Sequence, residues 1–214
     1  MTYSLKQIGD KKLLYVMAAQ PEYGVELQAR INPLMCGVGP VEAAVMVTNA
    51  LTELKLKGDM PFMVVSLGSA GSRTLEQTGV YQAKTVSYRD MDASALGFEK
   101  GTTPLLDLPK ELTMPVLMHG IEAVKLSTGA NVVSGAAYDD IDADMVDMET
   151  FAILRACHLF DRPLIALRGI SDGKDELDKL EDWTEYLHII DAKLAQIVDI
   201  LEENINSNSL TFQN

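Results

Sequence analysis

Apolar residues along the chain fall into two kinds of segment that differ in spacing. Short continuous apolar runs are typical of buried strands, whereas apolar residues three and four positions apart are typical of helices. The short runs predict strands at 13–18, 34–36, 61–67, 126–129 and 163–170. The stretch 79–88 alternates apolar and polar residues, and this alternation predicts a further strand.

Three other segments have the spacing of helices. Pro40 suits a first helical turn, and positions 41, 44, 48, 51 and 54 follow it on one face. The segment 148–160 is apolar nearly all round, which predicts a central buried helix, and 183–201 predicts an amphipathic C-terminal helix. The polar tail at 204–214 is expected to fray. Because strands and helices alternate without repeat or linker, we expect a single three-layer α/β/α domain over 1–214.

Composition and charge narrow the possible partners. The net charge of -13 argues against nucleic acid, because phosphates are held by Lys and Arg. The first residues are polar, and no apolar run reaches the ~18 residues that a membrane span needs. We therefore expect no signal peptide and no membrane-spanning segment. Cys36 and Cys157 have no metal or redox spacing and are expected to be buried thiols. A cytoplasmic enzyme without metal or cofactor fits these features.

Polar residues and glycines gather where predicted strands end. Glu22 follows the first strand, Gly68–Gly71 follows the third, Asp147–Glu149 precedes the buried helix, and Arg168–Asp172 ends the last strand. In open α/β sheets, ligands bind beyond the carboxyl ends of the strands. These four segments are therefore the candidate site.

Each candidate also has a purely structural interpretation. Asp147 and Glu149 suit the N-terminus of the buried helix, where carboxylates interact well with free N–H groups, and a carboxylate can equally hold a vicinal diol. Asp172, before Gly173, could cap a turn or serve as a half-buried acid with a raised pKa. Arg168 could pair with a structural charge or bind an anion or water.

The acidic segment Tyr138–Asp144 contains four aspartates. It lacks the spacing and the glycine of an EF-hand loop. We therefore expect a solvated connection there and no metal site.

Five short motifs follow one another between Leu13 and Leu201. They are GVGPVEAA at 37–44, GSAG at 68–71, YRDMD with GFE at 88–92 and 97–99, VDME at 146–149 and RGISD at 168–172. In this order and at these intervals they resemble the nucleoside phosphorylase/nucleosidase family, above all its 5'-methylthioadenosine/S-adenosylhomocysteine nucleosidase branch. The resemblance implies a central mixed sheet, cleavage of the N-glycosidic bond of a purine ribonucleoside, and a homodimer.

The resemblance also implies roles for individual residues. Asp172 matches the general acid that protonates or hydrogen-bonds N7 of the departing adenine, and Glu22 matches the carboxylate that positions and activates water. Ser69 and Arg168 match residues around that water. The other implied substrate-binding residues are Glu149 at the ribose hydroxyls, Met148 against the sugar, and Asp147, Ser171, Val132, Val133 and Phe98.

Two positions depart from the nucleosidase pattern, and a third distinguishes hydrolysis from phosphorolysis. Val132 stands where the nucleosidases carry an aromatic residue that stacks on adenine, and Ala130 replaces an aspartate. Hexameric phosphorylases carry an arginine at the position matched by Ser66, and a phosphate co-substrate needs such a cation. Hydrolysis of methylthioadenosine or S-adenosylhomocysteine is therefore favoured. The alternatives are hydrolysis or phosphorolysis of futalosine, inosine or adenosine, and a catalytically idle nucleoside-binding protein.

Overall fold

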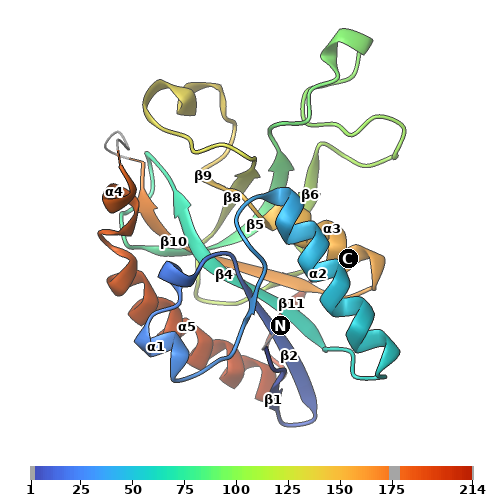
Figure 1. The fold of residues 1–214 in the computed structure, drawn as a ribbon, viewed down its shortest axis with the longest axis vertical. Coiled ribbons are helices and arrows are strands. Elements are labelled where there is room, and N and C mark those ends of the chain that lie inside the picture. Colours follow the sequence, from blue (N-terminus) through green and yellow to red (C-terminus); the bar gives the residue numbers. More distant parts are fainter. Residues whose placement is uncertain (1–2, 174–178, 214) are drawn as a thin grey trace.

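A mixed β-sheet forms the centre of the protein (Figure 1). The computed structural model describes residues 3–173 and 179–213. Within them the strand order is β1-β2-β4-β10-β5-β8-β9, with β3 beside β2 and β6 beside β5. The strands are β1 (Lys6–Ile8), β2 (Lys11–Met17), β3 (Leu34–Met35), β4 (Met63–Gly71), β5 (Val80–Tyr88), β6 (Glu111–Thr113), β8 (Ala123–Thr128), β9 (Met145–Asp147) and β10 (Leu164–Asp172).

Both parallel and antiparallel pairs occur in this sheet. The pairs β2–β4, β4–β10, β5–β8 and β8–β9 are parallel, whereas β10–β5 is antiparallel. An additional antiparallel contact joins Gly71 of β4 to Val146 of β9. This contact closes β4, β10, β5, β8 and β9 into a ring, so the ends of strands distant in sequence meet in one place.

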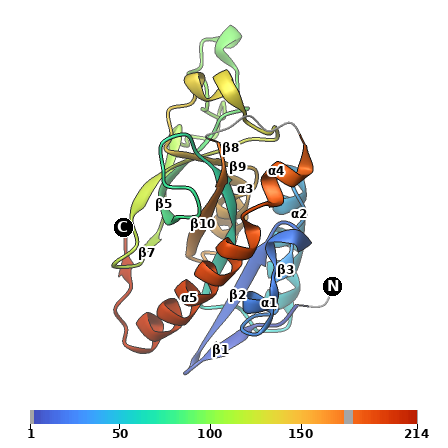
Figure 2. The ribbon, with the colours of Figure 1, turned by 90° about the vertical axis from the view of Figure 1, so that its left-hand side faces the viewer.

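Helices cover both faces of the sheet (Figures 1 and 2). On one face lie α2 (Pro40–Leu56) and α3 (Thr150–Leu159), and on the other lie α1 (Val25–Gln28) and α5 (Leu187–Asn206). The short helices are α4 (Leu180–Thr184) and the 3-10 helices η1 (Gln20–Glu22), η2 (Ser94–Leu96) and η3 (Gly135–Asp140). The predicted three-layer α/β/α architecture with a mixed sheet is confirmed.

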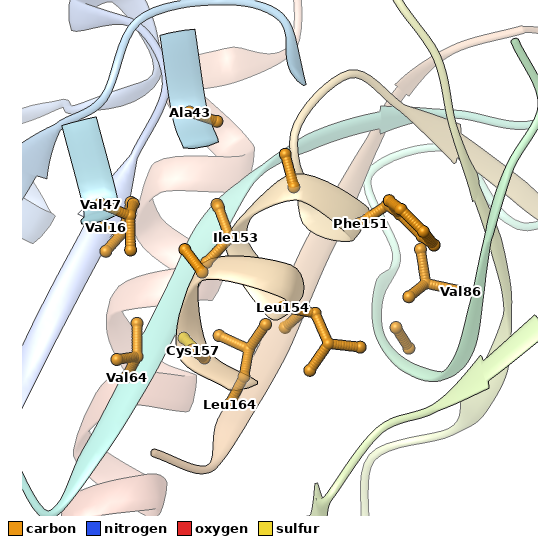
Figure 3. Packing of buried hydrophobic residues seen from close by; sticks show 14 of the residues in the cluster. Val16, Ala43, Val47, Val64, Val86, Phe151, Ile153, Leu154, Cys157 and Leu164 are labelled. Carbon is orange, nitrogen blue, oxygen red and sulfur yellow. The ribbon is translucent and has the colours of Figure 1, made fainter. Parts of the chain in front are cut away.

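Alternation along β2 explains why the sheet has two cores. Leu13, Tyr15 and Met17 pack in the cluster that contains α5, whereas Leu14 and Val16 pack in the cluster that contains α2 and α3. Successive strand residues point to opposite faces, so a continuous apolar run serves both layers. Figure 3 shows the α3 side, where side chains of the helix meet those of the strands. Full burial of each such side chain contributes roughly 1.5–3 kcal/mol.

Two helical predictions need correction. The buried face of α2 is formed by Ala43, Val47, Ala50, Leu51 and Leu54, while Val41, expected on that face, is 70% exposed. The C-terminal helical pattern divides into α4 and α5, and this division places Trp183 on α4 at the site described below.

The prediction of a frayed tail was wrong. Helix α5 continues to Asn206, and β11 (Thr211–Phe212) pairs with β7 (Val116–Leu117). Phe212 also meets the ring of Phe62 edge to face, at 6.1 Å between centroids. These contacts give a polar segment partners that its own composition does not indicate.

Cys36 and Cys157 are buried free thiols, as expected. Across residues 3–173 and 179–213, none of the helices combines the length and apolar character that crossing a bilayer requires.

Candidate active site

A cavity of about 600 Å³ opens at the carboxyl ends of β4 and β10. Its volume is in the range of small-molecule sites. Eight of the predicted site residues line it: Glu22, Ser69, Val132, Val133, Asp147, Met148, Glu149 and Asp172. Residues far apart in the sequence therefore meet here, as the strand-end argument predicted.

Three predicted residues do not line this cavity. Ser171 is buried and donates its hydroxyl to Asp172, which does line the cavity. Phe98 lies beyond η2 on the arm that projects past the sheet (Figure 1, green). Arg168 lines a smaller adjoining cavity of about 10 Å³, together with Glu22 and Ser69. That volume is roughly the room needed for a single water molecule.

Glu22 is held at the wall between the two cavities. It ends η1 and is buried, and its Oε1 accepts hydrogen bonds from the backbone N–H and the hydroxyl of Ser69, both at 2.7 Å. Its Oε2 accepts from the N–H of Ala19 at 3.3 Å. Burial raises the pKa of this carboxyl, although the Ser69 hydrogen bonds oppose the rise. The carboxyl is thus fixed in direction and more basic than an exposed glutamate.

Trp183 belongs to this arrangement, although the sequence pattern suggested only a core position for it. Its indole N–H donates to the hydroxyl oxygen of Ser69 at 2.9 Å. Since Ser69 accepts from Trp183, its own proton is directed to Glu22. The chain has one tryptophan, and the sequence placed it at the start of the predicted helix at 183–201, where nothing indicated a polar partner for its indole.

Asp172 is the last residue of β10 and faces the main cavity. The strand register shifts between Ile170 and Asp172, and such a bulge redirects the side chains that follow it. Ser171 donates to Asp172 Oδ1 at 2.5 Å. Burial raises the pKa of Asp172, and the Ser171 hydrogen bond limits that rise. The alternative role as the cap of a following turn concerns residues 174–178, which lie outside the described part of the chain.

Glu149 connects the start of α3 to the start of α2. Its Oε1 accepts the backbone N–H of Gly39 at 2.8 Å. Gly39 has φ 98°, a backbone conformation that favours glycine. Burial, with the nearby charge of Asp147, raises the pKa of Glu149 to about 8. Near neutral pH this carboxyl is therefore mostly protonated and can both donate to and accept from ligand hydroxyls.

Asp147 and Arg168 form a buried ion pair. Arg168 is 2% exposed and Asp147 is 5% exposed, and Asp147 Oδ2 accepts from Arg168 Nε at 3.2 Å and Nη2 at 3.0 Å. Asp147 also accepts from the hydroxyl of Thr128 and from the backbone N–H of Thr150. The capping interpretation of Asp147 is confirmed, and its carboxylate is occupied by protein donors although the residue borders the cavity.

Arg89 holds the loop that follows β8 to the ends of two strands. Its guanidinium donates to the backbone oxygens of Ser127, Asp147 and Asn131. Arg89, Asn131 and the 66% exposed Val132 all line the cavity. Arg89 belongs to the YRDMD motif, but the sequence indicates no role for it, because its carbonyl partners come together only through the strand pairing.

This geometry supports acid–base chemistry on a bound small molecule. Glu22 and Asp172 are carboxyls in different environments that line one cavity, and Glu149 adds a third group suited to hydroxyls. Pairs of acidic groups in contrasting environments serve as acid and base in glycosidic bond cleavage.

Comparison with known proteins gives consistent results. The chain is 30% identical over 196 residues to a 5'-methylthioadenosine/S-adenosylhomocysteine nucleosidase of Haemophilus ducreyi, with 82% of this chain and 81% of that protein covered. In fold, it is similar to the Helicobacter pylori 5'-methylthioadenosine/S-adenosylhomocysteine nucleosidase bound to butyl-thio-DADMe-Immucillin-A, with a TM-score of 0.73, 17% identity, and 90% and 97% of the two chains covered. It is also similar to the futalosine hydrolase of the same organism, with a TM-score of 0.72, 17% identity, and 89% and 97% covered.

A sequence model of a whole family completes the comparison. The model of the phosphorylase superfamily matches residues 23–201, which include all the residues around the cavity except Ala18, Ala19 and Glu22. The match extends over most of the chain and includes the motifs that carry the resemblance. The chain therefore belongs to the phosphorylase superfamily, the family of nucleoside phosphorylases and nucleosidases.

Proposed function

We propose that the protein hydrolyses the N-glycosidic bond of 5'-methylthioadenosine, S-adenosylhomocysteine or both, releasing adenine. The observation that carries the proposal is the convergence of Asp172, Glu22 and Glu149 on one cavity of about 600 Å³. The relative from Haemophilus ducreyi, described as a nucleosidase for these two compounds, supports the choice of substrate.

Asp172 acts on the departing base. An adenine anion is a poor leaving group, so a proton placed on N7 helps the bond between the sugar and N9 to break. Because burial raises the pKa of Asp172, more of this carboxyl carries a proton near neutral pH than in an exposed aspartate. General acid–base assistance of this kind typically contributes about 10²–10⁴-fold to the rate.

Glu22 activates the attacking water in this proposal. The small cavity that it shares with Ser69 and Arg168 has room for roughly one water molecule. As the sugar becomes oxocarbenium-like, the water adds to C1' and gives its proton to Glu22. The two hydrogen bonds from Ser69 keep Glu22 aimed at that water.

Glu149 and Met148 bind the sugar in this proposal. Glu149 holds the ribose hydroxyls, and Met148 lies beside it on the cavity wall.

Two observations favour water over phosphate as the attacking group. Ser66 occupies the position where hexameric phosphorylases carry an arginine. In addition, the Arg168 guanidinium is already used by Asp147, Ser66 and Thr150. Neither residue offers a cation that is available to a phosphate co-substrate.

A second candidate is hydrolysis of another purine nucleoside, such as futalosine, inosine or adenosine. The specific observation is Val132, which is 66% exposed and replaces the aromatic residue expected to stack on adenine. The similarity in fold to a futalosine hydrolase is compatible with this candidate.

Base release decides among these possibilities. Each nucleoside is incubated with the protein, with and without phosphate, and the free base is quantified by chromatography. The proposal expects adenine from methylthioadenosine or S-adenosylhomocysteine without phosphate. Strict phosphate dependence would overturn hydrolysis, preferential release from futalosine or inosine would favour the second candidate, and binding without release would indicate a catalytically idle binding protein.

The assembly and the location are separate proposals. A homodimer, expected from the resemblance, is tested by sedimentation of the purified protein. A cytoplasmic location is tested by fractionation of the cells that produce it.

A further inference from the structure

The hydroxyl of Tyr138 is buried and, among the described residues, has no hydrogen-bond partner. It lies on η3, in the acidic segment that the sequence predicted to be a solvated connection. A buried hydroxyl without a partner costs free energy, and phenylalanine would fill the same space without that cost. The position of this oxygen therefore calls for a physical explanation.

Asp172 is the acidic group whose charge acts on this hydroxyl. A methyl group placed on Gly71 would collide with both Tyr138 Oη and Asp172 Oδ2, the latter at 2.8 Å. The two oxygens therefore flank the same glycine. Since Ser171 already donates to Oδ1, Oδ2 is the oxygen left for Tyr138. Burial is the largest cause of the raised pKa of Tyr138, and the negative charge of Asp172 raises that pKa further.

Arg73 holds Tyr138 in place from the outer side. Its guanidinium lies 5.5 Å from the centre of the Tyr138 ring, pairs with Asp139 and donates to the oxygen of Gly135 at 3.4 Å. Arg89 is the second cation that acts on the Tyr138 hydroxyl. The charged side chains that act on this hydroxyl are thus Asp172 at the end of β10, Arg73 after β4 and Arg89 after β5.

We propose that Tyr138 is a positioning residue for the general acid Asp172, an inference that rests on the proposed function. Asp172 Oδ2 gives its proton to N7 of the purine while the C1'–N9 bonding pair passes to the base, and water adds to C1' and loses a proton to Glu22. As Oδ2 becomes negative, the Tyr138 O–H turns to donate a hydrogen bond to it. Solvent then returns the proton to Asp172 and removes the one on Glu22.

Two features make Tyr138 a hydrogen-bond donor and exclude it as the proton source. Its pKa is raised, so the hydroxyl stays neutral and keeps its proton. Asp172 lines the cavity, whereas the Tyr138 hydroxyl is covered and reaches the base only through Asp172. The hydrogen bond lowers the pKa of Asp172 and makes loss of its proton easier, because hydrogen bonds to the charged form favour that form.

The test compares Tyr138→Phe with Tyr15→Phe. Tyr15 is also buried and donates its hydroxyl to a carboxylate, Glu202, at 3.2 Å, but does not line the cavity. Four quantities are measured in both variants: kcat, KM, the alkaline limb of the pH profile, and the melting temperature. The pKa of Asp172 is also followed directly by carbon NMR of the carboxyls, with and without adenine, using Asp172→Asn to assign the signal.

The proposal expects opposite outcomes for the two variants. Tyr138→Phe lowers kcat about 10-fold with KM nearly unchanged, and raises both the Asp172 pKa and the alkaline limb by about one unit. At a pH where Asp172 is protonated, its melting temperature is equal or higher, because a buried hydroxyl without a partner has been removed. Tyr15→Phe leaves kcat and the limb unchanged and lowers the melting temperature through loss of its hydrogen bond.

An Asp172 pKa that is the same in wild type and Tyr138→Phe would overturn the inference, even if activity fell. Loss of activity through KM alone would do the same. If the wild-type protein released no base from any nucleoside, the proposed function would fail instead. The NMR comparison would still decide whether Tyr138 controls the acidity of Asp172, so the two failures are distinguishable.

Discussion

Replacing Arg168 by methionine tests whether the ion pair beneath the cavity holds the fold together. Methionine keeps much of the length of the side chain and removes its charge. Asp147, 5% exposed, would then be a buried carboxylate without its cation. The hydroxyls of Ser66 and Thr150 would also lose the guanidinium donor, at 2.9 and 2.7 Å.

The size of the effect follows from burial. Removing one partner of a buried ion pair costs roughly 3–5 kcal/mol. In a chain of this length one kcal/mol corresponds to about 2–4 °C, so the melting temperature of Arg168→Met should fall by roughly 6–20 °C. Removing both charges, as in Arg168→Met with Asp147→Asn, leaves no isolated charge, and the loss should be smaller than the sum of the two single losses.

Urea unfolding followed by circular dichroism measures these free energies, and calorimetry measures the melting temperatures. The matched control is Arg30→Met, which breaks a partly exposed ion pair of 3.0 Å with Asp199 and should cost far less, because solvent screens exposed pairs. Two results would refute the reasoning: a cost for Arg168→Met within that of the control, or single losses that add in the double variant to within about 0.5 kcal/mol.

Three further outcomes are expected. Asp172→Asn should lower kcat by about 10²-fold or more and change ligand affinity little, as measured by turnover and by calorimetric binding; equal losses in both would contradict its role as acid. The pKa of Glu149 is raised to about 8, so the folded state keeps a proton that the unfolded state releases near pH 4.5. The free energy of unfolding should therefore fall as pH rises from about 4.5 to about 8. Glu149→Gln should flatten that fall in urea titrations at pH 6 and 9, and an unchanged slope would exclude Glu149 as its source. Asp191 accepts hydrogen bonds from the N–H groups of Gly24, Glu26 and Leu27 at 3.1, 2.9 and 3.1 Å. Asp191→Ala should therefore lower the free energy of unfolding by at least about 2 kcal/mol, and it should lower kcat because the segment that carries Glu22 loosens. A variant of normal stability in urea unfolding would contradict this role of Asp191.

Local patterns predicted the elements whose physics is local. The apolar run at 13–18 and the alternation at 79–88 correspond to β2 and β5, since a strand side chain points to a face fixed by its position alone. The spacing after Pro40 predicted α2 but assigned Val41 to the wrong face. Which stripe of a weakly amphipathic helix is buried depends on what packs against it, and this information lies in α3 and the sheet.

The candidate site was predictable to the extent that residues follow strand ends. Eight of the proposed residues line the cavity because parallel strands bring their carboxyl ends to one edge. Phe98 lies outside it, on an arm whose direction no local pattern indicates. Trp183 and Arg89 had no predicted role, because their partners are distant in sequence.

By itself, the sequence determined the layer order, the two-sided burial of the sheet and the strand ends that carry chemistry, because hydrophobic periodicity is set residue by residue. The tertiary structure alone decided how each charge is used. The fold brings Arg168 of β10 to Asp147 of β9, and it places the Tyr138 hydroxyl of η3 against the same glycine, Gly71, as Asp172. Ionisable groups respond to whichever partners lie within a few ångströms, and spacing along the chain does not specify those partners.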